Sequence, residues 1–432
     1  MKNLLRFCLS CPLSLALLNG CGGSGLDTES SVRLVNATSE YTTLDLYAGS
    51  DRVSAGVASN SVGAYATLDA NTYTFNLKSG GSTATAVSTS REAVKKKHQT
   101  LVAYTTGGAL TTEYLSDEEG APRSGTAKLR LFHTAATDAG NVDMYVVNTA
   151  CADLQNSTAA ALATGVSGLQ SGYVEVSAAT GGTAYHVCIT GAGDKTALRL
   201  DVPALTLSNQ QVTTLILTRT AGGVLLNGLL LNQQGSLAQA LNTSARVRVA
   251  ANAAAASTVT ASVGGVSLGL NYTSPAVGSY KLVPAGALAL SLNVSGTTTT
   301  VSSLNASAGS DYTLLVTGAA TGPVATLIAD SNTPSTSTAR PVKLRLVNGL
   351  NGTSASATLA YNYDQVGDGA AALSANSPSL VASSAALARL EASFGGTSLV
   401  VGTTITLESG KVYSLFLLGD AASPQTILRA DR

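Results

Sequence analysis

Val32-Arg33-Leu34-Val35-Asn36 is a short apolar run that carries one arginine, and it returns three more times along the chain. The later copies are Leu129-Arg130-Leu131-Phe132-His133, Val247-Arg248-Val249-Ala250 and Leu344-Arg345-Leu346-Val347-Asn348. From arginine to arginine the steps are 97, 118 and 97 residues, which is a domain-sized period. The 432-residue sequence therefore predicts a tandem array of four units.

Short strand-like segments fill each unit, separated by Gly, Ser, Asn and Asp turns. In Leu44-Asp45-Leu46-Tyr47 apolar and polar residues alternate, which is typical of a strand with one buried face. Turns every 8 to 12 residues, in units of about 100 residues, indicate an all-β chain of small antiparallel β-sandwiches. We assign the sandwiches to residues 32–120, 128–235, 246–331 and 342–432, the second with an insertion.

The four arginine runs, together with Leu44-Asp45-Leu46-Tyr47 and Val142-Asp143-Met144-Tyr145 behind two of them, resemble the DUF4397 family. That family comprises modules of unknown function in secreted and surface proteins, often in tandem copies. The resemblance implies an immunoglobulin-like fold for each unit. It is stronger in the first two units than in the last two, where the aspartate is replaced, and it transfers no catalytic residues.

Residues 1–20 are typical of a targeting segment rather than of a folded domain. Lys2 and Arg6 give a positively charged start, and an apolar stretch follows. Leu18-Asn19-Gly20-Cys21 then fits the bacterial lipoprotein signal, in which small residues admit the peptidase and the cysteine thiol receives diacylglycerol. We therefore expect a signal peptide at 1–20, lipidation of Cys21 and a flexible tether over 21–31.

The residue after Cys21 is not aspartate, which favours the outer over the inner membrane by the usual sorting rule. Each acyl chain contributes about 0.8 kcal/mol per buried methylene, so several chains make a stable anchor. We expect a lipid-anchored protein of the cell envelope, facing the periplasm or the surface. Two alternatives stay open: a secretory peptide with an incidental cysteine, and a cytosolic amino terminus. The apolar run 224–231 is far too short to span a membrane.

Cys151 and Cys188 are the cysteines that remain after the signal and the lipidated residue are set aside. In an exported, oxidising compartment such a pair predicts a disulfide. The bridge would close a loop of about 37 residues and stabilise its unit by roughly 3 to 4 kcal/mol. The alternative is a metal-binding or catalytic thiol, although His186 alone does not make a site.

Charge is sparse and balanced, with 25 Lys and Arg against 25 Asp and Glu. This balance gives no basic footprint for nucleic acid and no field to steer an acidic substrate. Aromatic residues make up 5% of the chain and include no Trp, so wide stacking surfaces must come from Tyr. Tyr65, Tyr173 and Tyr280 recur at comparable places in the first three units. They are interpreted as half-buried strand residues, with a repeated sugar or peptide cleft as the alternative.

Arg33 lies 12 residues before Asp45, and Arg130 lies 13 before Asp143. The spacing suits an ion pair between neighbouring strands, worth about 0.2 to 1 kcal/mol when exposed. The last two units keep the arginine without the acid. We therefore assign a structural role to the repeat arginines, with a repeated ligand site as the alternative: Arg33, Arg130, Arg248 and Arg345.

His98, His133 and His186 fall in different predicted strands of two units, and no Gly-x-Ser-x-Gly elbow is present. A catalytic triad needs a nucleophile, a base and an orienting acid brought together. The acidic stretches 117–119 and 364–369 do not supply the six to eight oxygens that calcium takes. We expect no catalytic residues, no metal and no cofactor.

The second unit is about 20 residues longer than the first, and the surplus lies between Val147 and Gly172. Loops on rigid sandwiches are the usual places for recognition, and repetition adds avidity. The candidate recognition loop is 150–171, with Asp153, Gln155 and Asn156 as its candidate residues. We expect a non-enzymatic structural, adhesive or recognition module that binds an envelope protein or a polysaccharide. An accessory subunit of an envelope transport or enzyme complex and a pure spacer remain as alternatives.

Overall fold

The computed structural model describes residues 28–168, 170–179, 181–220, 222–254, 256–319 and 321–432. The expected signal peptide at 1–20, Cys21 and the start of the tether lie outside these ranges. Strands dominate the described chain and pair into eight sheets, so the predicted all-β fold class is confirmed. Among these residues, none of the helices has the length and apolar character needed to cross a bilayer.

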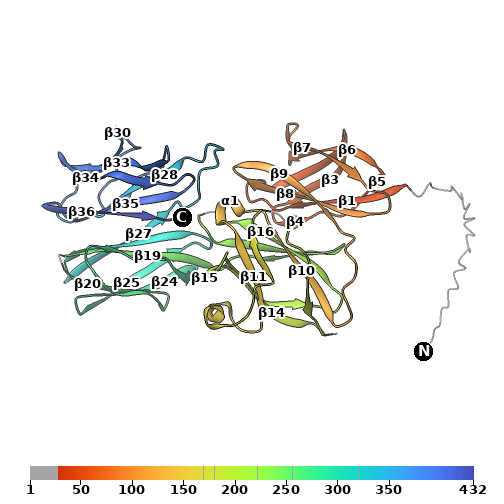
Figure 1. The fold of residues 1–432 in the computed structure, drawn as a ribbon, viewed down its shortest axis with the longest axis horizontal. Helices are drawn as coiled ribbons and strands as arrows, with labels where there is room; N and C mark the ends of the chain where they lie inside the picture. Colours follow the sequence, from red (N-terminus) through yellow and green to blue (C-terminus); the bar gives the residue numbers. More distant parts are fainter. Residues whose placement is uncertain (1–27, 169, 180, 221, 255, 320) are drawn as a thin grey trace, which may run out of the picture.

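The eight sheets stack two by two into four β-sandwiches, each around its own apolar core (Figure 1). The first strand of each sandwich carries the repeat arginine, and we call it the arginine strand. The sheet that contains this strand is the inner sheet, and the other is the outer sheet.

The first sandwich has an inner sheet of order β4-β1-β8-β9, with β5 also on β1, and an outer sheet of order β3-β2-β6-β7. Its arginine strand begins at Glu29, so residues 29–31 belong to the sheet and not to the tether. The strands are β1 (Glu29–Asn36), β2 (Thr43–Ala48), β3 (Asp51–Ala58), β4 (Ser61–Val62), β5 (Ala66–Asp69), β6 (Asn71–Ser79), β7 (Thr85–Ala93), β8 (His98–Thr106) and β9 (Ala109–Ser116).

The second sandwich has an inner sheet of order β13-β10-β16-β17-β18 and an outer sheet of order β12-β11-β14-β15. A one-turn helix, α1 (Ala136–Ala139), and a 3-10 helix, η1 (Cys151–Asn156), lie in its loops. The strands are β10 (Thr126–His133), β11 (Val142–Val147), β12 (Ala163–Val166), β13 (Val174–Ser177), β14 (Thr183–Gly191), β15 (Asp194–Leu207), β16 (Val212–Arg219), β17 (Leu226–Asn232) and β18 (Leu237–Ala240).

The third sandwich repeats the plan, with an inner sheet of order β22-β19-β26-β27, β23 also on β19, and an outer sheet of order β21-β20-β24-β25. Its strands are β19 (Ser244–Ala253), β20 (Thr258–Val263), β21 (Val266–Thr273), β22 (Ala276–Val277), β23 (Lys281–Pro284), β24 (Gly286–Val294), β25 (Thr297–Ala306), β26 (Asp311–Ala319) and β27 (Gly322–Asp330).

The fourth sandwich has an inner sheet of order β31-β28-β35-β36, with β32 also on β28, and an outer sheet of order β30-β29-β33-β34. Its strands are β28 (Val342–Asn348), β29 (Ala357–Tyr361), β30 (Asp364–Gln365), β31 (Ser374–Ala375), β32 (Ser379–Val381), β33 (Ser384–Phe394), β34 (Thr397–Leu407), β35 (Val412–Asp420) and β36 (Ser423–Ala430).

The inner sheets are mixed rather than purely antiparallel. Each arginine strand pairs in parallel with a strand near the end of its sandwich, which then forms a hairpin with the next strand: β1 with β8, β10 with β16, β19 with β26 and β28 with β35. Two parallel strands need a long crossover connection, and here the outer sheet supplies it. Strand patterning in the sequence does not show this pairing, because alternation reports burial and not direction.

The arginine strand is buried on both faces, which explains why it is a nearly continuous apolar run in the sequence. In β1, Val32 and Leu34 point into the core of their own sandwich. Val35 lies on the opposite face and packs with Phe132 and Ile216 of the second sandwich. The inner sheets of the first two sandwiches therefore meet face to face.

The third and fourth sandwiches meet in the same way. Ala250 and Leu315 of the third pack with Val347 and Phe416 of the fourth. The alanine, like Val35 and Val347, stands two residues after the repeat arginine. We call sandwiches one and two the first pair, and sandwiches three and four the second pair.

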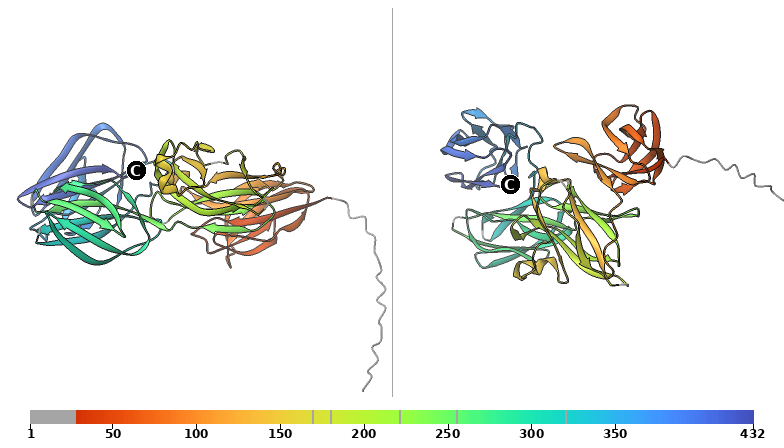
Figure 2. Two further views of the ribbon diagram at one scale, coloured as in Figure 1. Left: turned by 90° about the horizontal axis from the view of Figure 1, so that it is seen from below. Right: turned by 45° about the vertical axis from the view of Figure 1, so that its right-hand side comes forward.

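The two pairs lie side by side, with the second and third sandwiches adjacent (Figures 1 and 2). The Thr220 hydroxyl donates to the Gly309 carbonyl at 2.8 Å, which joins the second sandwich to the third. Arg432 Nη2 donates to the Thr137 carbonyl at 3.1 Å, which joins the fourth sandwich to the second. These two contacts between the pairs are polar, whereas contacts within each pair have an apolar centre.

Candidate functional site

All four repeat arginines are buried, with 2 to 9% of each residue exposed. Each guanidinium Nε donates to a hydroxyl on the parallel neighbouring strand. The bonds are Arg33 to Thr100 at 2.8 Å, Arg130 to Thr214 at 2.9 Å, Arg248 to Thr313 at 3.0 Å and Arg345 to Ser414 at 2.8 Å. The repeated arginine is therefore one half of a repeated side-chain pair between β-strands.

A carboxylate completes this pair in three sandwiches. The hydroxyl donates to an aspartate 17 residues later, at the end of the last strand: Thr100 to Asp117, Thr313 to Asp330 and Ser414 to Asp431. Sequence reasoning missed these residues and treated the first of the acids as part of a solvated linker cluster. The constant separation of 17 residues is the signal that could have found them.

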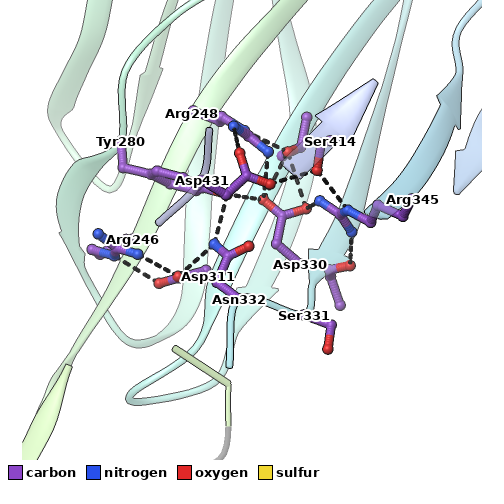
Figure 3. A network of polar contacts seen from close by, with 12 residues as sticks. Arg246, Arg248, Tyr280, Asp311, Asp330, Ser331, Asn332, Arg345, Ser414 and Asp431 are labelled. Carbon is purple, nitrogen blue, oxygen red and sulfur yellow. Dashed lines mark hydrogen bonds and ion pairs between the residues drawn. The ribbon is translucent and has the colours of Figure 1, made fainter. Parts of the chain in front are cut away.

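In the second pair the arginines reach across to the neighbouring sandwich (Figure 3). Arg248 of the third sandwich bonds Asp431 of the fourth, and Arg345 of the fourth bonds Asp330 of the third. Arg248 also lies 3.6 Å from Asp330, so this carboxylate stands between both arginines. The exchange is reciprocal, as expected for two similar surfaces packed face to face.

Further polar groups surround this centre. Arg246 Nε donates to Asp311 at 2.7 Å, and the Asn332 amide donates to Asp311 and to the Tyr280 hydroxyl at 2.7 and 2.9 Å (Figure 3). Three arginines thus face three aspartates, and the buried network is balanced in charge. Burial alone would lower the pKa of Arg248, but the neighbouring Tyr280, Asp431 and Asp330 raise it above its ordinary value.

The first pair lacks this balance. Gln233 stands at the register position that aspartate holds in the other sandwiches, since Thr214 pairs with Leu231 and the carboxylate would follow two residues later. Arg130 donates to Gln170 instead, and no ion pair found within the described ranges includes it. Burial lowers the pKa of Arg130 below its usual value. Arg33 lies 3.7 Å from Asp117 and donates to the Gly235 carbonyl of the second sandwich at 2.6 Å.

The recurring tyrosines cover the arginines. The centre of the Tyr65 ring lies 4.5 Å from the guanidinium carbon of Arg33, and Tyr173 and Tyr280 lie 4.4 and 4.5 Å from those of Arg130 and Arg248. Cation–π contacts of this kind strengthen when they are desolvated. The tyrosines therefore belong to the same sites as the arginines.

The predicted ion pairs of Arg33 with Asp45 and of Arg130 with Asp143 are wrong. The arginines lie in the inner sheets and the aspartates in the outer sheets, so the strands concerned are not neighbours. Asp45 accepts a hydrogen bond from the backbone N–H of Gly56 at 2.6 Å, and Asp143 does the same for Gly165 at 2.7 Å.

Each of these glycines sits in an irregular part of the outer edge strand with a φ near +60°, a conformation that glycine favours. A bulge of this kind turns an edge strand away from pairing with other chains. The aspartate of the Leu-Asp-Leu-Tyr strand therefore fixes a bulge in the first two sandwiches. The third sandwich has Ala261 in the equivalent strand.

Cys151 and Cys188 form the predicted disulfide, with Cα atoms 5.5 Å apart. It ties η1 to strand β14 of the outer sheet. Leu154, a residue of η1, is fully buried. Lys195 Nζ donates to the carbonyls of Ser157 and Ala159 at 2.7 and 2.8 Å. These contacts fix the first part of the insertion against the sheet.

The candidate recognition residues Asp153, Gln155 and Asn156 are all exposed on η1. They lie on one short helix, so the structure brings them together as one polar surface. The rest of the insertion forms part of a groove of about 450 Å³ between β12 and β13. An equivalent groove of about 480 Å³ runs along β3 to β5 of the first sandwich.

The three histidines have separate environments. His98 Nδ1 lies 3.1 Å from Glu118, and His186 Nδ1 lies 3.1 Å from Asp201. His133 is fully buried, its Nε2 bonds the Gly140 carbonyl at 2.8 Å, and its Nδ1 has no partner. It stands where Asn36 and Asn348 bond the loops of their own sandwiches. None of the histidines lines either groove.

His186 lies close to two other residues with possible metal-ligand atoms. His186, Asp201 and Cys151 place possible ligand atoms within 4.8 Å of one another. Sequence reasoning did not connect Asp201 with this cysteine pair, because Asp201 lies 50 residues after Cys151 and meets Cys188 only through the pairing of β14 with β15. In the structure the sulfur atoms are tied up in the disulfide.

Residues 30–145 match the family model described as Domain of unknown function (DUF4397), which confirms the resemblance over this range. The match covers the first sandwich and reaches into β11 of the second. No curated protein matches this sequence.

Among solved structures, similarity extends to CBMbc, a family CBM26 module from Eubacterium rectale Amy13K in complex with maltoheptaose, at 10% identity and a TM-score of 0.16, over 48% of this chain and 97% of that one. A putative cell adhesion protein from Bacteroides uniformis gives 10% and 0.15, over 44% and 98%. The Bacillus anthracis TIE protein gives 9% and 0.15, over 90% and 68%. These likenesses add nothing to the all-β architecture.

We expect Arg345→Met to destabilise the second pair by about 3 kcal/mol, because it removes one partner of a buried ion pair and leaves Asp330 with Arg248, 3.6 Å away, as its remaining arginine. Arg130→Met, at the same register in the first pair, should cost only about 1 to 2 kcal/mol, since it removes hydrogen bonds to uncharged acceptors and leaves no carboxylate unpaired. Denaturant unfolding of the two variants measures the difference. Equal losses would contradict the assignment of Arg130 as an arginine without a carboxylate partner.

Burial lowers the pKa of His133 to about 4, whereas an unfolded chain gives about 6.5. The unfolded state therefore binds the proton first, and stability falls as the pH drops from about 6.5 to about 4, by about 3 kcal/mol in all. His133→Asn, which installs the residue of the first and fourth sandwiches, should remove this component. Unfolding free energies of both proteins from pH 7 to 4 give the test, and parallel profiles would refute it.

Proposed function

We propose that this chain, which carries a DUF4397 domain at residues 30–145, is a non-enzymatic recognition or adhesive protein of the cell envelope. In this proposal the paired sandwiches are a rigid body, and the η1 loop of the second sandwich contacts an envelope protein or a polysaccharide. A lipid on Cys21 holds the protein at the membrane, with the outer membrane favoured by the residue that follows.

The observation that carries this proposal is the fixation of η1. Its one disulfide, its buried Leu154 and the two hydrogen bonds from Lys195 hold the loop while Asp153, Gln155 and Asn156 face solvent. A loop that is already ordered loses little conformational entropy on binding. Fixed polar side chains on an inflexible scaffold are what a recognition surface requires.

The exposed groups of η1 define its chemistry. One carboxylate accepts hydrogen bonds, and two amides both donate and accept them. Sugar hydroxyls and polar protein backbones offer matching donors and acceptors. The groove beside the same insertion, between β12 and β13, extends the surface available to a long ligand.

The anchor places a limit on reach. Strand β1 begins at Glu29, eight residues after Cys21. At about 3.4 Å per extended residue the tether spans at most about 27 Å. A lipid on Cys21 would therefore keep the first sandwich close to the bilayer.

A spacer is the second candidate, and the buried ion pairs between the third and fourth sandwiches favour it, since they resist bending within the second pair. It differs from the first proposal in needing no ligand. The two functions therefore separate in a single binding experiment.

The triple variant Asp153→Ala, Gln155→Ala, Asn156→Ala should lose its partner in a crosslinking pull-down from intact cells. The matched control is Asp364→Ala, Gln365→Ala, Asp368→Ala, which changes an exposed turn of similar composition in the fourth sandwich. One envelope partner lost only from the η1 variant supports recognition by this loop. If both variants capture the same partners, recognition lies elsewhere on the array. If neither variant nor the unchanged protein captures a partner, the spacer is supported.

Cys21→Ser should release the protein from the membrane fraction, because the thiol that carries the acyl chains is gone. Fractionation of cells that express either form measures this. Retention of the serine form in the membrane fraction would rule out Cys21 as the anchor.

A further inference from the structure

Four residues with metal-ligand side chains meet at the base of η1. His186 and Cys188 are two apart on β14, so their side chains share one face of the outer sheet. Asp201 pairs with Cys188 across the β14–β15 ladder and lies on the same face. Cys151, the first residue of η1, comes down onto this face from above.

The distances are short. Asp201 Oδ1 lies 3.0 Å from Cys151 Sγ and 3.1 Å from His186 Nδ1, and the sulfur of Cys188 is bonded to that of Cys151. Ligand atoms around a four-coordinate zinc ion lie roughly 3.3 to 3.8 Å apart, given bond lengths of about 2.0 to 2.3 Å. Small movements would therefore turn this cluster into a tetrahedral shell.

The chemistry of the set also fits. Two thiolates, an imidazole nitrogen and a carboxylate oxygen are ligands that zinc accepts, and mixed sulfur and nitrogen shells favour zinc over calcium or magnesium. The cysteines are 0 to 3% exposed, whereas the His186 and Asp201 side chains are 27 and 36% exposed. An ion can therefore approach from the side of the histidine and the aspartate.

We propose that the dithiol form of this protein binds one divalent ion of the zinc class between Cys151, Cys188, His186 and Asp201. A dithiol reductant supplies two electrons and two protons, the S–S bond breaks, and the reductant becomes a disulfide. The ion then displaces the two thiol protons and forms two metal–sulfur bonds. The disulfide and the metal ion are alternative ways to hold η1 against the outer sheet. Neither depends on whether η1 binds a partner.

The first sandwich contains a control for this site. His98 and Glu118 form a histidine–carboxylate pair with the same 3.1 Å separation, and they too are partly exposed. The sequence has no cysteine between residues 22 and 150, so this pair has no thiol beside it in the first sandwich. A metal that needs only the histidine and the acid would use both pairs equally.

The experiment titrates Co²⁺ into the full-length protein, oxidised or reduced with a phosphine, under anaerobic conditions. We expect thiolate-to-cobalt charge-transfer bands from the reduced protein alone, at one ion per chain. His186→Ala and Asp201→Ala should each weaken binding by at least about tenfold, since even outer-shell changes reach that size. His98→Ala should bind as tightly as the unchanged protein.

A second measurement guards against unfolding of the reduced chain. Zn²⁺ should raise the melting temperature of the reduced protein and leave that of Cys151→Ser, Cys188→Ser unchanged. The proposal fails if charge-transfer bands are missing, or if the double serine variant binds Co²⁺ as tightly as the reduced protein. It fails equally if Zn²⁺ does not stabilise the reduced form, or if His186→Ala and Asp201→Ala keep full affinity.

Discussion

Burial of the arginine strand on both faces is the constraint on which the remaining structure depends. One face completes the core of its own sandwich, and the other must be covered by a second sandwich. A guanidinium on the second face is tolerable only when it is paired or hydrogen-bonded, because an unpaired buried charge is very costly. The hydroxyl of the parallel strand, the tyrosine ring and the carbonyl or carboxylate of the neighbour meet this need.

The two pairs meet the constraint in different ways. The second pair exchanges arginines and aspartates reciprocally around Asp330, whereas the first pair replaces one carboxylate with Gln233. The apolar centres of the two interfaces also differ, since Val35 packs with Phe132 and Ile216 in the first, whereas Ala250 packs with Val347 and Phe416 in the second. Both solutions keep the outer sheets and their loops at the surface.

Much of this fold could be predicted from the sequence, and the failures have physical causes. The arginine runs gave the repeat, and the two remaining cysteines gave the disulfide, because both signals are local. The direction of the β1–β8 pair, the partner of Arg33 and the role of Asp45 depend on which sheet each strand joins. Strand alternation reports only that a residue is buried or exposed. The meeting of Asp201 with Cys151 is likewise set by register across β14 and β15.

The parallel pairing also sets an order of events in folding. Thr100, the partner of Arg33 within its own sandwich, lies 67 residues further along, and Gly235 in the next sandwich lies 202 residues further. Contacts at such separations form late and slowly, because the intervening loop must close first. A chain that emerges amino end first cannot close a sandwich until nearly all of it is out. The inner sheet of that sandwich keeps one apolar face uncovered until the following sandwich is complete. The sandwiches therefore reach their final packing two at a time.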